Sequence, residues 1–170
     1  MSKAKFQLLP LAATHDRTAF SCGSEPLDRY FQEQVTQDIR RRITACFVAV
    51  SNEQQIAGYY TLAATSVPLT GLPAKIAKKL PRYPLVPAVR MGRLAVAQNF
   101  QEHGLGGALL ADALHRAYVS DIAAYAMLVD AKDETASLLL APRLYFPSRY
   151  AAVIVFATRD GSEYLSLVTE

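Results

Sequence analysis

The spacing of apolar residues predicts an amphipathic helix near the start of the chain. Apolar side chains recur with helical spacing over residues 27–39, and only Gln34 interrupts the stripe. Ser24 stands where a helix N-cap is expected, and Pro26 falls in the first turn. Further helical patterns cover residues 74–80, residues 105–118 and the stretch around residues 134–140.

Apolar runs bounded by turn residues predict seven strands. They cover residues 6–9, 45–50, 56–66, 89–96, 124–129, 151–157 and 164–168. A short polar link joins the second run to the third and predicts an antiparallel hairpin, and the last two runs predict another at the C-terminus. The fourth and fifth flank the helix at 105–118, an order that predicts a β-α-β unit with two parallel strands. After Leu80, repeated X-Pro steps favour an extended chain.

Composition narrows the class of protein. The chain has 170 residues, of which 51% are hydrophobic and 19% charged, so we expect one folded domain over residues 1–170 rather than a disordered, collagen-like or coiled-coil chain. Cys22 and Cys46 have no metal-ligand spacing, and we expect two reduced, packed thiols and no metal site. Neither a signal peptide nor an apolar stretch of membrane-spanning length is present, so we expect a cytoplasmic protein without membrane association.

The net charge is only +3, but the charge is unevenly distributed. Between Gln54 and Gln101 there is no acidic residue. The basic residues of this interval are Lys75, Lys78, Lys79, Arg82, Arg90 and Arg93. Two interpretations stay open for them: a solvated basic loop, or a surface that attracts an anionic partner.

The segment with the most chemical information joins the strand at 89–96 to the helix at 105–118. Gly104, Gly106 and Gly107 open that helix, where backbone N–H groups and the helix dipole favour a phosphate. The alternative is that these glycines only permit a tight turn and close packing. The loop lacks the P-loop lysine and the third glycine of the dinucleotide motif, but it fits Q-x-x-G-x-G from Gln101 to Gly106.

This motif, between a strand and a helix, resembles the acetyl-coenzyme A pyrophosphate loop of the GNAT N-acetyltransferase superfamily. Other segments, spread over residues 20–136, resemble the GNAT toxins of bacterial toxin–antitoxin modules. They are S-C-G at 21–23, L-D-R-Y at 27–30, Q-D at 37–38, G-Y-Y-T-L at 58–62, L-P-R-Y-P at 80–84, G-R-L-A-V at 92–96 and V-D-A-K-D-E at 129–134.

The resemblance implies an α/β (α+β) fold in which helices flank a mixed, mostly antiparallel sheet with one splayed parallel pair. Acetyl-coenzyme A (acetyl-CoA) would lie in that splay as co-substrate, and a main-chain N–H near Val96 would stabilise the oxyanion of the reaction. The implied cofactor-binding residues are Leu94, Ala95 and Val96 on the strand, and Gln101, His103, Gly104, Leu105, Gly106 and Gly107 in the loop.

Toxins of this type acetylate the α-amine of aminoacyl-tRNA and so block translation. Their resemblance implies this N-acetyltransferase activity here, with a ribbon-helix-helix antitoxin as partner and a homodimer as assembly. Basic residues would then contact tRNA phosphates, and our candidates are Arg40, Arg41, Arg42, Lys78, Lys79 and Arg82. Each has the alternative of a solvent-facing charge or a contact to the antitoxin. Arg93 lies inside a strand of the core motif, which indicates a structural or active-site pairing.

The chain departs from the family where the catalytic tyrosine is expected. The usual Phe-Tyr pair falls on Leu139 and Leu140, and Tyr145 is the nearest candidate general acid, with packing beside Phe146 as the alternative. Two other functions therefore stay open. One is acetylation of a small amine or a protein, and the other is an attenuated or inactive homologue that binds coenzyme A.

Overall fold

A computed structural model describes residues 5–72, 74–130, 153–157 and 164–168. The chain forms two compact units. Unit 1 comprises Met1–Ala63 and Gly92–Asp112, and unit 2 comprises Ala64–Met91 and Ala113–Glu170. The single domain expected over residues 1–170 stays a prediction.

Seven strands are described, and they are those that the sequence predicts, with shifts of a few residues at their ends. They are β1 (Gln7–Pro10), β2 (Ala45–Val50), β3 (Ile56–Pro68), β4 (Leu85–Val96), β5 (Ala126–Asp130), β6 (Val153–Ala157) and β7 (Tyr164–Val168). β1 pairs with β2, β2 with β3 and β6 with β7 in antiparallel fashion. β4 and β5 are parallel, which confirms the predicted mixed α/β fold. β5 and β6 form a second parallel pair that the sequence did not predict.

The first predicted helix is confirmed, but it is not a uniform α-helix. α1 (Glu25–Arg29) continues through the π-helix η1 (Tyr30–Gln34) into α2 (Val35–Arg40). Arg17 Nη1 donates a hydrogen bond of 2.6 Å to the Phe31 carbonyl oxygen, in the wider π-helical turn. Ser24 occupies the predicted N-cap position, although its side chain makes no capping hydrogen bond.

The remaining helices follow the sequence prediction in order. They are the 3-10 turn η2 (Leu69–Gly71), α3 (Ala74–Ala77), the 3-10 turn η3 (Gln98–Phe100) and α4 (Leu105–Val119). α3 is shorter than predicted because a turn closes from the Leu80 N–H to the Ala77 carbonyl, and Pro81 then supplies no N–H. The helix predicted around residues 134–140 lies outside the described residues.

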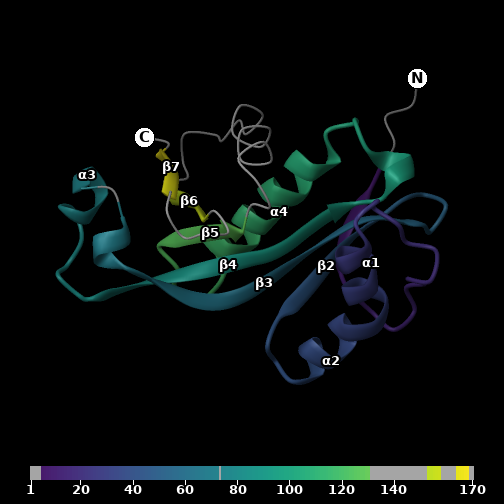
Figure 1. The fold of residues 1–170 in the computed structure, drawn as a ribbon, viewed down its shortest axis with the longest axis horizontal. Coiled ribbons are helices and arrows are strands. Elements are labelled where there is room, and N and C mark those ends of the chain that lie inside the picture. The colour runs from purple at the N-terminus through teal and green to yellow at the C-terminus, as the bar shows by residue number, and fades with distance from the viewer. Residues whose placement is uncertain (1–4, 73, 131–152, 158–163, 169–170) are drawn as a thin grey trace. The chain divides into compact units, whose positions relative to one another are not determined.

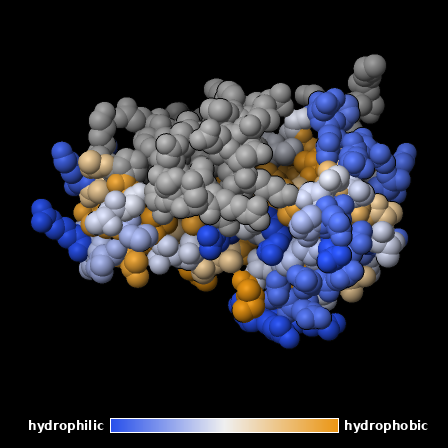
Figure 2. All heavy atoms as spheres, in the orientation of Figure 1, coloured by the Kyte–Doolittle hydropathy of each residue, from blue (hydrophilic) through white to orange (hydrophobic). Residues whose placement is uncertain are grey.

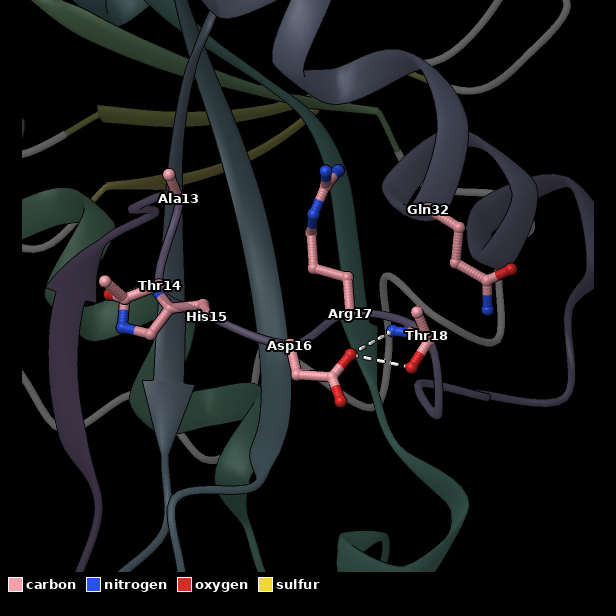
Figure 3. A pocket seen from close by; sticks show the side chains of 7 residues that line it. All are labelled: Ala13, Thr14, His15, Asp16, Arg17, Thr18 and Gln32. Atoms are coloured by element: carbon pink, nitrogen blue, oxygen red, sulfur yellow. Dashed lines mark hydrogen bonds between the residues drawn. The ribbon is translucent and has the colours of Figure 1, made fainter.

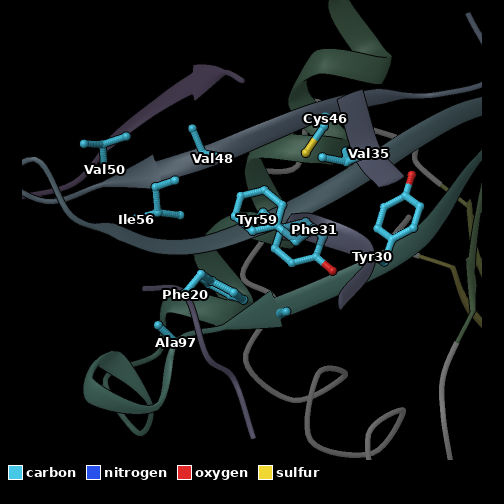
Figure 4. Packing of buried hydrophobic residues seen from close by; sticks show 11 residues of the cluster. Phe20, Tyr30, Phe31, Val35, Cys46, Val48, Val50, Ile56, Tyr59 and Ala97 are labelled. Carbon is cyan, nitrogen blue, oxygen red and sulfur yellow. The ribbon is translucent and has the colours of Figure 1, made fainter. Parts of the chain in front are cut away.

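Helices cover both faces of β3 within unit 1, where α1 and α2 lie beside β2 (Figure 1). Neighbouring residues of a strand point to opposite faces. Tyr59 stacks on Phe31 (Figure 4), with ring centroids 4.2 Å apart. The Tyr59 hydroxyl donates to the Leu27 carbonyl. Tyr60 faces α4 instead, where its hydroxyl donates to Asp112 Oδ2 at 2.5 Å. This arrangement fixes the start of α4 against the strands that carry the candidate site.

Unit 2 has an apolar core of its own. Val67, Val86, Ala88, Ala126 and Leu128 belong to it, with residues of η2 and α3 packed against them. None of the described helices is long and apolar enough to cross a membrane.

Candidate functional site

The glycine loop connects the end of β4 to the start of α4, as the sequence predicts. Glu102 and Gly104 have φ values of +67° and +78°, and these left-handed residues turn the chain into the helix. The first helical hydrogen bond runs from the Ala108 N–H to the Gly104 carbonyl at 3.2 Å. The N–H groups of residues 105–107 precede that bond, so they project from the positive end of a 15-residue helix. Such a terminus binds phosphate groups.

The surroundings of the glycines separate the two interpretations of the loop. A Cβ atom on Gly107 would meet nothing within 4 Å among the described residues, and one on Gly106 would meet only Val96 Cγ2 at 3.9 Å. Close packing therefore does not require glycine at either position. Gly104 has the same open space but needs its freedom for the positive φ. Gly106 and Gly107 thus leave room over the helix N-terminus, as a bound phosphate requires.

Gln101 holds the loop in place through its side chain. Its Nε2 donates hydrogen bonds of 3.0 Å to the carbonyl oxygens of Val96 and Cys22. Cys22 is fixed in turn, because its N–H donates to Asp28 Oδ1 at 2.8 Å. The Gln98 N–H donates to the Ser21 carbonyl at 2.9 Å and adds a further tie. The Gln101 amide is therefore a clamp on the loop, a role that sequence reasoning missed.

The end of β4 lies beside the loop. The register of β4 with β5 covers Ala88–Met91, and β4 then continues to Val96. Leu94, Ala95 and Val96 lie in this continuation, and the Val96 side chain approaches Gly106. The structure therefore brings the predicted strand residues and loop residues together. His103 is exposed in the same loop.

β3 packs closely against β4 and α4 beside the loop. A Cβ on Gly58 would lie 2.9 Å from both the Ala95 carbonyl oxygen and Leu109 Cδ1. Only glycine allows β3, β4 and α4 to meet this closely. The G-Y-Y segment at 58–60 of the toxin-like motifs therefore supports the site without lining it.

The predicted tRNA-binding residues form two exposed groups in different units. Arg40, Arg41 and Arg42 lie at the C-terminal end of α2 in unit 1, where the surface over α1 and α2 is mostly hydrophilic (Figure 2). Lys78, Lys79 and Arg82 are exposed in unit 2. Tyr83, beside Arg82, is 70% exposed, and an exposed aromatic ring next to cations suits nucleic-acid stacking. Arg82 and Tyr83 are adjacent in the sequence, and this pair could have indicated an exposed aromatic ring beside a cation.

The candidate general acid Tyr145 lies outside the described residues. Tyr30 and Tyr59, two buried tyrosines of unit 1, are unsuited to that role. Burial raises the pKa of Tyr59 and of Tyr30 above the usual tyrosine range, and both hydroxyls donate to acceptors in the fold.

A polar cavity of about 460 Å³ lies along residues 13–18, next to Gln32 (Figure 3). Most of its polar side chains bind one another or the backbone. Asp16 Oδ1 accepts hydrogen bonds from the Thr18 N–H and hydroxyl, which lowers the pKa of Asp16, and His15 Nδ1 accepts from the Ala12 N–H. Arg17 reaches the Phe31 carbonyl oxygen. Most polar side chains that line the cavity thus already have hydrogen-bond partners, and none of the predicted site residues lines it.

Both cysteines are free thiols, with Cys46 buried and Cys22 half-buried. Burial raises the pKa of Cys46 to about 12, and burial together with the Asp28 hydrogen bond raises that of Cys22. Among the described residues, no group of three or more His, Cys, Asp or Glu side chains could hold a metal ion.

No protein-family model matches the chain. A tRNA-acetylating toxin of Mycobacterium tuberculosis is 34% identical over 101 residues, which are 59% of this chain and 59% of that protein. A probable toxin TacT of Sinorhizobium fredii is 26% identical over 103 residues, 60% of this chain and 57% of that protein. The chain thus matches less than two thirds of the length of these curated relatives.

Solved structures match over more of the chain. AtaT complexed with acetyl-methionyl-tRNAfMet is 28% identical with a TM-score of 0.76 and covers 84% of this chain and 88% of its own. A KacT mutant in which a tyrosine is replaced by phenylalanine is 27% identical with a TM-score of 0.73, over 81% and 84%. AtaTR bound with acetyl-CoA is 27% identical with a TM-score of 0.69, over 84% and 86%. The resemblance to the GNAT toxins of toxin–antitoxin modules is therefore confirmed in sequence and in fold.

Proposed function

We propose that this protein transfers the acetyl group of acetyl-CoA to the α-amine of aminoacyl-tRNA, as a toxin that blocks translation. One observation carries the proposal. Gly106 and Gly107 leave the N-terminus of α4 open beside the end of β4, and 101 residues of the chain match a tRNA-acetylating toxin at 34% identity. The neighbour AtaTR was solved with acetyl-CoA, and AtaT with acetyl-methionyl-tRNAfMet.

The residues present fit the co-substrate. The N–H groups of Leu105, Gly106 and Gly107 would bind its pyrophosphate, with Gly104 shaping the turn and His103 at the exposed side. Leu94, Ala95 and Val96 would pair through their main chain with the pantetheine arm. Gln101 would hold the loop in position rather than contact the phosphates, because its amide already donates to two carbonyl groups.

The reaction replaces the C–S bond of the thioester with a C–N bond to the acceptor amine. The neutral acceptor amine attacks the thioester carbonyl, a C–N bond forms and the C–S bond breaks. The amine releases one proton to water, and the departing thiolate takes up one proton. The main-chain N–H near Val96 would donate to the carbonyl oxygen as negative charge develops there. Positioning of the amine against the carbonyl supplies a further part of the acceleration.

We propose Tyr145 as the group that protonates the departing thiolate, because Leu140 stands at the usual tyrosine position. A positioned general acid contributes about 10²- to 10⁴-fold to the rate. Tyr145→Phe should lower kcat by a factor in that range while the dissociation constant of coenzyme A stays the same. An unchanged kcat would remove Tyr145 from the mechanism, and a faster Leu140→Tyr variant would then identify an attenuated enzyme.

Lys and Arg contacts to tRNA phosphates would supply affinity that does not depend on sequence. The group at Arg40, Arg41 and Arg42 and the group at Lys78, Lys79 and Arg82 serve this role in the proposal. All six residues are exposed, as phosphate contacts require.

The resemblance to the toxins implies three further features that we propose with the activity. The partner is a ribbon-helix-helix antitoxin, the assembly is a homodimer, and residues 1–170 act as one acetyltransferase domain. We also propose a cytoplasmic location, because charged tRNA, the proposed substrate, is found with the translation machinery.

Transfer from labelled acetyl-CoA to a pool of charged tRNA tests the proposal. Label should appear in the RNA fraction and should vanish when the tRNA is deacylated before the reaction. Transfer that survives complete removal of RNA would favour a small-amine or protein acetyltransferase. Coenzyme A binding without transfer to any acceptor would favour an inactive homologue.

A further inference from the structure

Arg93 is a cation on β4 whose side chain lies on the face of the strand opposite to the glycine loop. Ala95 and Ala97, two and four residues further along, pack in the cluster with Phe31 and Tyr59. Side chains two apart on a strand share a face, so Arg93 lies on this face as well. Val96 points the other way, toward Gly106. The sheet thus separates the Arg93 guanidinium from the proposed pyrophosphate-binding site.

The guanidinium is held by an aromatic ring. Its central carbon lies 3.4 Å from the centroid of the Tyr30 ring. The ring itself is fixed, because Tyr30 is buried and its hydroxyl donates to Asp38 Oδ2 at 2.9 Å. A planar cation stacked in this way uses its face for the ring and keeps its N–H edge for a planar or tetrahedral anion.

No anion of the described part of the chain occupies that edge. Among the described residues, Arg29 forms an ion pair with Glu25, and Arg93 has no carboxylate within ion-pair distance. Arg93 is half-buried, so part of the residue is open to solvent. A pre-oriented guanidinium with an open edge is a binding group for phosphate.

We infer that Arg93 binds a backbone phosphate at the acceptor end of the tRNA, an inference that rests on the proposed function. Arg93 precedes Val96 by three residues, which is about 10 Å along an extended strand. In aminoacyl-tRNA, the aminoacyl ester and one ribose separate the α-amine from the nearest phosphate, a span of similar length. An amine placed at the thioester near Val96 therefore brings that phosphate within reach of Arg93. Tyr30 is the residue that positions Arg93.

The salt dependence of the reaction tests this role. At saturating acetyl-CoA, kcat/KM for charged tRNA is measured across a range of salt concentrations for the wild type, Arg93→Gln and Arg29→Gln. Loss of one phosphate contact should make the slope of log(kcat/KM) against log[salt] shallower by about 0.7 to 1 in Arg93→Gln. KM for charged tRNA should rise about 10-fold or more, with the dissociation constant of coenzyme A unchanged. Arg29→Gln, which removes an exposed arginine of α1, should match the wild type.

The possible results distinguish a failure of the Arg93 role from a failure of the proposed function on which it rests. Should Arg93→Gln fail to fold, Arg93→Met, which can pack on the Tyr30 ring, takes its place with the same expected slope. A folded variant with the wild-type slope overturns the role of Arg93, while wild-type transfer to charged tRNA leaves the proposed function standing. A wild type that does not acetylate charged tRNA overturns both.

Discussion

At the scale of single residues, Gly106 is the position where the proposed co-substrate and the fold make different demands. The fold tolerates a side chain there, since a Cβ would make only an ordinary contact with Val96. A pyrophosphate-binding site does not tolerate a side chain at this position, least of all a carboxylate.

Gly106→Asp should therefore raise the dissociation constant of coenzyme A about 10- to 100-fold, the loss expected for hydrogen bonds to a charged group. The melting temperature should not fall, because an acidic residue in the first turn of α4 complements the helix dipole. Isothermal titration calorimetry and a thermal melt measure the two quantities. Ala108→Asp, which adds the same charge at an exposed position of the same helix, is the control and should bind more tightly than Gly106→Asp. Unchanged coenzyme A affinity in Gly106→Asp would place the site elsewhere.

Gln101 acts at the same scale through the backbone. Gln101→Ala should weaken coenzyme A binding several-fold, because the loop loses both hydrogen bonds to the Cys22 and Val96 carbonyl groups. Asp28→Asn, which disturbs the carboxylate that holds Cys22, should have a smaller effect in the same direction. Binding is measured by calorimetry at constant salt. Wild-type affinity in Gln101→Ala would show that the clamp is dispensable.

The loop glycines could be predicted from the sequence, whereas the partners of Gln101 and Arg93 could not. Gly104, Gly106 and Gly107 were predicted because a strand, a loop and a helix adjoin in the chain, so the signal is local. The roles of Gln101 and Arg93 depend on Cys22 and Tyr30, which are more than 60 residues away in the sequence. No local pattern specifies such partners.

At the scale of elements, the packing of β3, β4 and α4 depends on Gly58. Gly58→Ala should lower the free energy of unfolding by about 1–3 kcal/mol, because its Cβ would lie 2.9 Å from a backbone oxygen. Gly107→Ala is the matched control. Its Cβ meets nothing within 4 Å, and alanine favours a helix, so stability should rise by about 0.5–1 kcal/mol. Urea titration measures both, and equal stability of the two variants would contradict the packing described for Gly58.

Elements with a strong local pattern were predicted well. β2 begins and ends at the predicted residues, and α4 begins at Leu105 and extends one residue beyond the predicted end. The π-helical turn η1 was not predicted, since the apolar stripe of residues 27–39 is the same for a continuous α-helix. Its distinguishing contact comes from Arg17, outside the helix. The parallel pairing of β6 with β5 likewise depends on tertiary structure rather than on the pattern within either strand.

At the scale of the whole molecule, buried ionisable groups set how stability depends on pH. Cys46 has its pKa raised to about 12 by burial, whereas an unfolded cysteine titrates near 8.5–9. Above pH 9 the unfolded chain loses this proton and the folded chain keeps it, so the free energy of unfolding falls as pH rises toward 12. The slope from Cys46 alone reaches about 1.4 kcal/mol per pH unit, and the raised pKa values of Tyr30 and Tyr59 act in the same direction at higher pH.

Urea titrations between pH 7 and 10 measure this dependence. Cys46→Ala should be less stable than the wild type at pH 7 but should lose less stability between pH 9 and 10. Parallel curves for the two proteins would show that the Cys46 thiol does not titrate with unfolding.

The proposed activity is a property of the whole molecule, because it would need the loop, the end of β4, the proposed general acid and the basic residues proposed to bind tRNA. Mass spectrometry of the product tests it most directly. Charged tRNA is treated with the protein and acetyl-CoA, digested with nuclease, and its terminal adenosine ester is analysed. We predict an aminoacyl-adenosine that carries one acetyl group on the α-amine, and a smaller yield of it from Gly106→Asp when acetyl-CoA is below saturation. An unmodified ester at saturating acetyl-CoA, from every charged tRNA in the pool, would contradict the proposed function.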